Sequence, residues 1–288
     1  MGAMTAEAPG EALAGLLRDY STEVTARDRR SIEAAQELLP RGAEVFIAAV
    51  PGESSDQMIA AAARLRAAGL VPVPHIVARN FAGLKDVDRL LGRLQDAAGV
   101  DRVLALGGDR DEPAGALHCS QQLIESGLFR AHGVTRLFIA CYPEGHPRVA
   151  DQVLEEARAA KLRTLADQGL GVTLISQFCF EAGPIVALAR RMRSQGPKVA
   201  YRVGVAGPAA RTILVKYALM CGIGPSLRAL KQRQALARNV LAGETPEALL
   251  AEVAAAQLED PGLNISGVHF FTFGALARSA GWAERMRR

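Results

Sequence analysis

The chain has 288 residues, of which 49% are hydrophobic, and its formal net charge is +4. This length suits either one barrel of about 250 residues or two smaller domains. The basic residues are scattered and no basic-aromatic motif occurs, so we expect no nucleic-acid partner. The apolar runs are too short to span a membrane.

Strand patterns recur along the whole chain. Short segments rich in apolar and β-branched residues predict eight strands, at 19–25, 44–50, 71–78, 102–106, 137–141, 171–177, 199–205 and 264–270. Pro72 and Pro74 are awkward in a strand ladder, because proline has no N–H to donate. Hydrogen bonding of the third strand is therefore expected around 75–77.

Helical patterns fill the intervals between these strands. They predict helices at 29–39, 54–68, 86–98, 116–126, after the fifth strand to about 168, at 184–194, at 208–256 with breaks at 222–224 and 243–245, and at 275–287. Ser54 is expected to cap its helix, and Pro147 suits the first turn of the helix after the fifth strand.

Eight alternating strands and helices in a chain of this length predict an α/β fold, a (β/α)8 TIM barrel at 19–288. A tail or short helix is expected at 1–18. A doubly wound sheet also alternates, but no GxGxxG follows the first strand and no GxxxxGK[ST] occurs. The barrel is therefore the favoured fold.

The cysteines and the amino terminus indicate an ordinary cytoplasmic protein. Cys119, Cys141, Cys179 and Cys221 are isolated, without the ligand spacing of a zinc site, so we expect no metal. Apolar neighbours predict that Cys141 and Cys179 are core residues. The first residues are small and polar and do not resemble a signal peptide, which predicts a cytoplasmic location.

Polar side chains gather where the predicted strands end, which is where barrel enzymes place their sites. These residues are Glu23, His75, Arg79, Asp109, Tyr142, Glu144, His146, Gln177 and His269. A single histidine at a strand end is more often structural than catalytic. The convergence of several such residues predicts an active site at one mouth of the barrel.

Six motifs carry a more specific signal. They are YSTEV (20–24), PHIVAR (74–79), LALGGD (104–109), YPEGHP (142–147), SQFCFE (176–181) and GVHFFTF (267–273). In this order, each at a predicted strand end, they resemble the methylenetetrahydrofolate reductase family. The resemblance runs from Tyr20 to about Phe273 and implies a folate- and flavin-binding (β/α)8 enzyme.

The resemblance also implies roles for individual residues. Glu23 matches the general acid that protonates the folate so that its five-membered ring opens to an iminium. Asp109 matches the acid that faces both flavin and pterin, and Gln177 and Phe180 fall in the substrate-binding motif. The residues matched to FAD binding are His75, Arg79, Gly108, Asp109, Tyr142, His146, Lys161 and Arg163.

The implied activity is an FAD-dependent interconversion of 5,10-methylenetetrahydrofolate and 5-methyltetrahydrofolate with NAD(P)H as co-substrate. The catalysis is reversible, so the oxidative direction, in one-carbon catabolism, is open as well. One alternative is a flavin-independent, tetrahydrofolate-dependent methyltransferase or demethylase on the same barrel, and another is a catalytically silent folate-binding barrel. Barrels of this kind usually associate, so we expect a homo-oligomer.

The sequence departs from the family pattern at three places. Gly107 stands where family members commonly have arginine, so a flavin contact must be missing or come from elsewhere. The segment after the seventh strand has no aromatic residue to face the aryl ring of the folate, and Leu165 stands where a lysine is expected.

Overall fold

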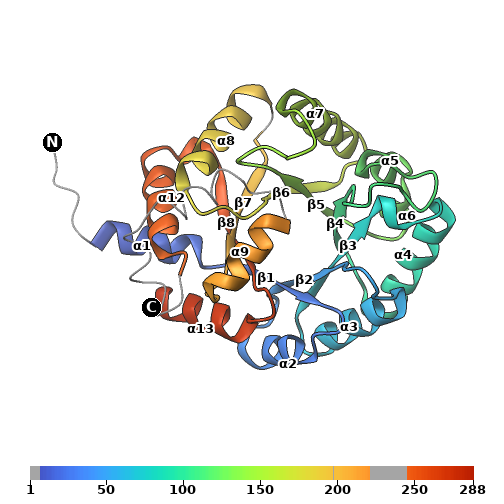
Figure 1. Ribbon diagram of the computed structural model, residues 1–288, viewed down its shortest axis with the longest axis horizontal. Helices are drawn as coiled ribbons and strands as arrows, with labels where there is room; N and C mark the ends of the chain where they lie inside the picture. Colours follow the sequence, from blue (N-terminus) through green and yellow to red (C-terminus); the bar gives the residue numbers. More distant parts are fainter. Residues whose placement is uncertain (1–6, 197, 221–244) are drawn as a thin grey trace. The chain divides into compact units, whose positions relative to one another are not determined.

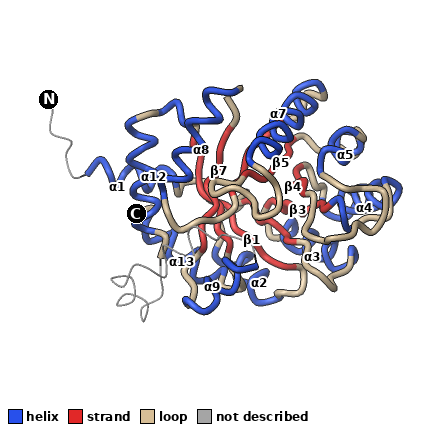
Figure 2. The backbone as a smooth tube through the Cα atoms, turned by 45° about the horizontal axis from the view of Figure 1, so that its top comes forward, coloured by secondary structure: helices blue, strands red, loops and turns tan. Residues whose placement is uncertain are grey.

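The structure is a computed structural model that describes residues 7–196, 198–220 and 245–288. Its eight strands follow one another around a closed barrel, β1 to β8, in chain order (Figures 1 and 2). The strands are β1 Ser21–Thr25, β2 Glu44–Ala48, β3 Val71–Val77, β4 Arg102–Leu106, β5 Arg136–Cys141, β6 Gly171–Ser176, β7 Ala200–Ala206 and β8 Ile265–Phe271. The predicted (β/α)8 barrel is thus confirmed.

Helices separate the strands along the chain. They are α1 Glu7–Leu16, α2 Arg29–Leu38, α3 Ser55–Ala67, α4 Leu84–Ala98, α5 Ser120–Glu125, α6 Leu128–Ala131, α7 Asp151–Asp167, α8 Ala182–Gln195, α9 Arg211–Met220, α12 Glu247–Glu259 and α13 Leu276–Met286, with 3-10 turns η1 Ala78–Asn80 and η3 Pro261–Leu263. The expected helix breaks at 222–224 and 243–245 fall in or at the edge of 221–244, outside the described residues.

Backbone contacts divide the chain into two compact units. The first unit comprises Met1–Ser21, Tyr142–Asp151 and Ile175–Arg288, and the second comprises Thr22–Cys141 and Gln152–Leu174. Each unit contributes several strands with their following helices.

In the second unit, helix signals in the sequence act as expected. Ser54 caps α3: its Oγ accepts the N–H of Gln57, and the Gln57 side chain accepts the N–H of Ser54. Gly99 ends α4 in a left-handed conformation with φ of 51°. Helix α3 packs on β2 and β3 and beside α4, as Figure 1 also shows. These helices cover strands whose apolar residues, such as Val45 and Ile47, are fully buried.

Strand β3 accommodates its prolines by pairing with different neighbours along its length. Val71–Pro74 pairs with β2, and the pairs with β4 begin only at His75 and run to Val77. The expected late pairing is therefore correct for the β4 side. The strand nevertheless begins at Val71, earlier than the prolines suggested.

In the first unit, α12 packs against α1 and α8, and α1 lies against β8. Tyr20, just before β1, places its ring edge-on to Phe270 at 5.5 Å and donates its hydroxyl to Glu284 Oε1 at 3.3 Å. The hydrogen bond therefore connects the residue directly before β1 with α13.

Two predicted helix starts were wrong. Pro147 precedes α7 rather than opening it, because it lies in a tight turn, closed by a bridge in which the N–H of Val149 donates to His146 O at 3.3 Å, and the helix begins only at Asp151. Helix α5 begins at Ser120 instead of 116, because the Gln122 side chain accepts the N–H groups of His118 and Cys119 and caps the helix there.

Cys141 and Cys179 are buried, as predicted, whereas Cys119 is exposed. Cys221 lies outside the described residues. Burial raises the pKa of the Cys141 thiol to about 12, although the charge of Arg158 opposes this shift. The thiol of Cys141 is therefore a packing group and not a nucleophile.

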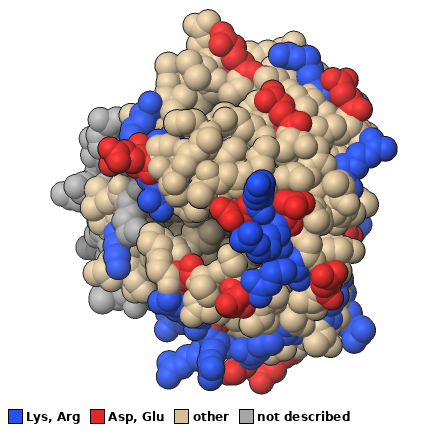
Figure 3. Space-filling view, turned by 90° about the vertical axis from the view of Figure 1, so that its right-hand side faces the viewer, with Lys and Arg blue, Asp and Glu red and all other residues tan. Residues whose placement is uncertain are grey.

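The last features of the fold are the hydropathy of its helices and the distribution of charge on its surface. No helix among them is long and apolar enough to cross a membrane. On the face shown in Figure 3, basic and acidic side chains are interspersed. Such mixing is typical of a solvated surface.

Candidate functional site

Glu23 and His75 lie close together in the second unit. His75 Nε2 is 3.6 Å from Glu23 Oε2, and the two side chains are 9% and 18% exposed. Strands β1 and β3 are not neighbours, since β2 lies between them, so the contact crosses the barrel interior. The structure thus brings together two residues that the sequence predicted at strand ends.

Two buried phenylalanines, Phe46 and Phe138, lie beside this pair. The imidazole of His75 contacts the ring of Phe46 edge-on, with centroids 6.2 Å apart. Phe46 in turn contacts Phe138 of β5 at 4.9 Å, and both phenylalanines are fully buried. Water is therefore excluded on one side of Glu23 and His75, which strengthens electrostatic interactions there.

Asp109 lies beyond the end of β4, in the segment 107–119 that leads to α5. It is exposed. The preceding Gly108 has φ of +108°, and a Cβ atom there would come within 2.6 Å of Val77 Cγ1. Only glycine fits this position, which indicates that Gly108 shapes the turn before Asp109.

Arg79, predicted as a cofactor ligand, lies at the end of β3 in η1. Its guanidinium donates to the carbonyl oxygens of Arg110 and Asp111, at 2.7 and 2.6 Å, and to that of His118 at 3.3 Å. All three acceptors belong to the segment that carries Asp109.

In the first unit, Tyr142 and His146 lie together in the loop after β5. Their rings meet edge-on with centroids 5.1 Å apart, and both side chains are half-buried. His146 Nδ1 accepts the backbone N–H of Arg148 at 3.2 Å. In the neutral imidazole the proton therefore resides on Nε2, which makes Nε2 a donor.

Lys161 and Arg163 do not lie on one face of α7. Residues two apart on a helix point in different directions, and Lys161 is half-buried whereas Arg163 is exposed. Burial lowers the pKa of Lys161, although a thiolate at Cys119 would oppose this. Leu165 is fully buried, so this position packs in the core.

Gln177 and Phe180 follow β6 in the first unit. Gln177 is the first residue after the strand, not its last, and its Oε1 accepts the N–H of Phe178 at 3.0 Å. This bond fixes the carboxamide and leaves its NH2 group to donate. The ring of Phe180 contacts Phe178 edge-on at 5.9 Å.

A cluster of aromatic side chains in the first unit was missed at the sequence level. Tyr217 of α9 stacks on Phe273, with ring centroids 4.3 Å apart and planes 24° apart. Phe178 contacts both Phe271 and Phe273, and Phe180, Tyr217, Phe271 and Phe273 are only partly buried. Phe273 has φ of 49°, which is unusual for a bulky residue. The motif GVHFFTF was noted, but Tyr217 gave no signal because a single tyrosine in a helix is ordinary.

His269 lies within β8 rather than at its end. It is 1% exposed, and its Nδ1 is 2.9 Å from Ser21 Oγ, which is itself fully buried. This buried pair is a structural contact of the first unit.

No protein-family model matches the sequence. Among solved structures, the chain is similar to dihydropteroate synthase from Thermus thermophilus (18% identity, TM-score 0.45, covering 92% of this chain and 93% of that one). It is also similar to 3-dehydroquinate dehydratase from Aquifex aeolicus (12%, 0.41, covering 69% and 84%) and to 2,3-dimethylmalate lyase, a PEP mutase/isocitrate lyase superfamily member (12%, 0.49, covering 96% and 84%). Similarities this low do not bear on activity.

The side chains themselves indicate what chemistry is available. Glu23 is a partly buried carboxyl group that can hold or release a proton. Among the described residues, no group of three or more His, Cys, Asp and Glu side chains could hold a metal ion. Lys161 offers a cation from a partly desolvated position, which suits the phosphate of a cofactor.

Proposed function

We propose that the protein is an FAD-dependent oxidoreductase that interconverts 5,10-methylenetetrahydrofolate and 5-methyltetrahydrofolate with NAD(P)H. The observation that carries this proposal is the position of Glu23, in the barrel interior beside His75, whose imidazole contacts the buried ring of Phe46. The sequence motifs around Glu23, Asp109 and Gln177 add support: Asp109 and Gln177 follow the ends of β4 and β6, and Glu23 is the middle residue of β1.

Glu23 is proposed as the general acid. The substrate has a reduced carbon that bridges two amines, and one amine must leave before the carbon accepts hydride. Glu23 donates its proton to that amine, the C–N bond breaks, and the ring opens to an iminium. In the oxidative direction, the carboxylate takes the proton back when the ring closes.

Asp109 and Gln177 are proposed to recognise the pterin. Its amide-like edge presents both donors and acceptors. The carboxylate of Asp109 accepts from the donors. The NH2 group of Gln177 donates, since its oxygen already accepts the N–H of Phe178.

FAD supplies the hydride-transfer chemistry when it is bound. The donors of this chain fit its phosphates at Lys161, because an anion beside a desolvated ammonium restores the favourable charge pairing. The resemblance also matches Tyr142 and His146, in the loop after β5, to FAD binding. Arg163, which is exposed and lies on a different face of α7, is left out of the proposed phosphate contact.

The visible absorption spectrum of the purified protein tests this function. We expect flavin bands, present on purification or after incubation with FAD, that bleach without oxygen when 5-methyltetrahydrofolate is added. A colourless protein that takes up no FAD but transforms a tetrahydrofolate derivative would contradict the proposal. It would favour the flavin-independent methyltransferase or demethylase.

A further inference from the structure

The segment 107–119, between β4 and α5, has no helix or strand of its own, yet it is held at many points. Most of these points converge on Arg79. The backbone N–H of Arg79 donates to Gly107 O at 3.0 Å, and Arg79 O accepts the N–H of Ala114 at 2.9 Å. Its guanidinium donates to three more carbonyl oxygens in the segment, those of Arg110, Asp111 and His118. Arg79 thus makes five hydrogen bonds to the segment, and their partners extend from Gly107 to His118.

Two glycines let the segment approach β3 and η1 this closely. A side chain at Gly108 would collide with Val77 and would also press on the Arg79 stem, 3.4 Å from its Cβ. A side chain at Gly115 would collide with the backbone of Ala82, whose carbonyl oxygen accepts the N–H of Ala116. The backbone is therefore shaped to fold over Arg79.

We infer that Arg79 is a positioning residue, which fixes the segment that carries Asp109. The inference rests on the proposed function for the role of Asp109. A long segment without regular structure samples many conformations unless tertiary contacts restrict it. The planar fork of a guanidinium can bind several carbonyl oxygens at once, whereas the single ammonium of lysine cannot reproduce this arrangement. Arg79 thus acts through Asp109 and is not itself a ligand of the cofactor.

Arg79→Lys keeps the charge and removes the fork, so it isolates the geometric role. We expect faster hydrogen exchange of the backbone amides of 107–119, with unchanged exchange elsewhere in the barrel. A displacement of Asp109 by about 1 Å is enough to lower the folate half-reaction by up to about 10²-fold. FAD affinity should change little, and Arg79→Gln should behave like Arg79→Lys.

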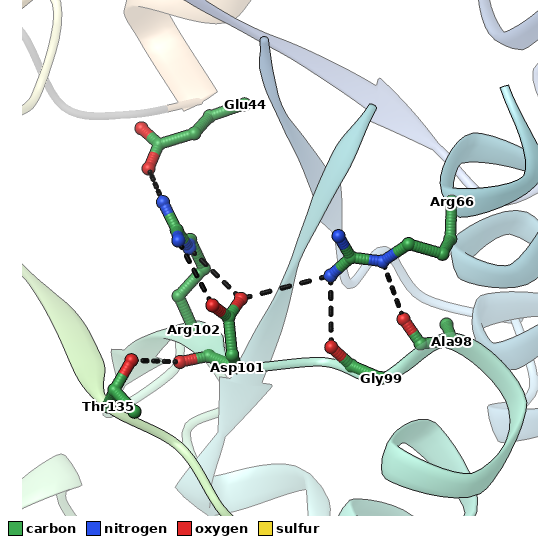
Figure 4. Close-up of polar contacts among 7 residues, drawn as sticks. All are labelled: Glu44, Arg66, Ala98, Gly99, Asp101, Arg102 and Thr135. Atoms are coloured by element: carbon green, nitrogen blue, oxygen red, sulfur yellow. Dashed lines mark hydrogen bonds and ion pairs between the residues drawn. The ribbon is translucent and has the colours of Figure 1, made fainter. Parts of the chain in front are cut away.

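Arg66→Gln is a matched control. Arg66, in the last turn of α3, also donates to two backbone carbonyl oxygens, those of Ala98 (2.7 Å) and Gly99 (2.9 Å), which lie at the C-terminal end of α4, before β4 begins (Figure 4). Its loss removes bonds of the same kind without touching the segment 107–119. We expect it to leave both the exchange of that segment and the folate half-reaction unchanged.

A double variant separates positioning from direct contact. If Arg79 acts through Asp109, Arg79→Lys should cause less than about a 2-fold further loss in an Asp109→Asn background, since residues that act as a unit are non-additive. Full additivity, or loss of FAD affinity with 107–119 still protected, would overturn the inference. Unchanged exchange in Arg79→Lys would overturn it as well. Faster exchange in a protein whose wild type binds neither folate nor flavin would support the positioning of the segment and refute the proposed function.

Discussion

His75 Nε2 lies 3.6 Å from Glu23 Oε2, a distance too long for a hydrogen bond but short enough for a strong electrostatic contact. The resemblance matched His75 to flavin binding and Glu23 to acid catalysis. Because the two side chains are this close, a substitution at one alters the surroundings of the other, so the two roles have to be tested together.

The first prediction concerns Glu23→Gln. The glutamine is nearly isosteric and polar, so FAD and folate binding should persist, but it cannot donate a proton as an acid. Reduction of FAD by NAD(P)H does not need this proton and should be retained. The folate half-reaction should slow by about 10²–10⁴-fold. Stopped-flow flavin absorbance, with each half-reaction followed separately, makes the measurement.

A double-variant cycle with His75→Gln serves as the control for this prediction. Groups in contact show non-additive effects, whereas distant groups add. We expect coupling between Glu23→Gln and His75→Gln in the folate half-reaction, and none between Glu23→Gln and Arg66→Gln. Equal, mild losses in both half-reactions of Glu23→Gln would mean that Glu23 is a structural residue.

The barrel itself could be predicted from the sequence because its signals are local. Apolar strands, a capping serine at Ser54 and a C-terminal glycine at Gly99 each act within one element, and each acts as expected. Helix starts after loops were less predictable. At Pro147 and before Ser120 the boundary depends on contacts that form only on folding, the backbone bridge between His146 and Val149 and the side-chain cap from Gln122.

The environment of each predicted site residue was less accessible from the sequence. The resemblance led us to expect an arginine where Gly107 stands, and Arg79, in η1 directly after β3, donates to Gly107 O and to the loop beyond it. The sequence separates these residues widely, so only the register of β3 and β4 brings them together. The same holds for Tyr217 and Phe273, which supply aromatic surface from α9 and from beyond β8.

A second prediction distinguishes Lys161 from Arg163. Lys161→Ala should weaken FAD binding, because it removes a partly buried cation, whereas Arg163→Ala should have little effect. An ordinary lysine has a pKa of about 10.4. Burial lowers the pKa of Lys161, so Lys161 loses its positive charge at a lower pH than an ordinary lysine does. FAD affinity should therefore fall as the pH rises toward that value, and Lys161→Ala should abolish this dependence. Titration followed by flavin fluorescence measures both effects; equal losses in the two variants would contradict the assignment.

A third prediction concerns stability in acid. Burial alone would raise the pKa of Asp101, but hydrogen bonds and charge from Arg102, with the charge of Arg66, lower it on balance (Figure 4). A carboxyl group with a lowered pKa stabilises the fold fully above its unfolded pKa, about 3.9. That contribution is lost as the pH falls through the folded pKa.

Asp101→Asn should accordingly be less stable than the wild type at pH 7, and the difference should narrow below about pH 4. Urea unfolding at a series of pH values measures this. Glu37→Gln, which alters an exposed carboxyl group of α2, is the control and should leave the wild-type pH dependence in place. The same narrowing in both variants would argue against a specific role for Asp101.

The last prediction tests whether the aromatic cluster supplies the contact to the aryl ring that the resemblance led us to expect from the segment directly after β7. Tyr217 and Phe273 stack at 4.3 Å, and their rings remain partly exposed next to Phe180. If this surface binds the aryl ring of the folate, Phe273→Ala should weaken folate binding by about 3- to 10-fold, as expected for one lost aromatic contact. Tyr217→Phe keeps the stacked ring and should bind folate normally. Leu219→Ala, on the exposed side of the same helix, controls for general effects on α9. Isothermal titration of the folate against all three variants measures the affinities, and a loss in Leu219→Ala as large as that in Phe273→Ala would exclude the cluster as a folate-binding surface.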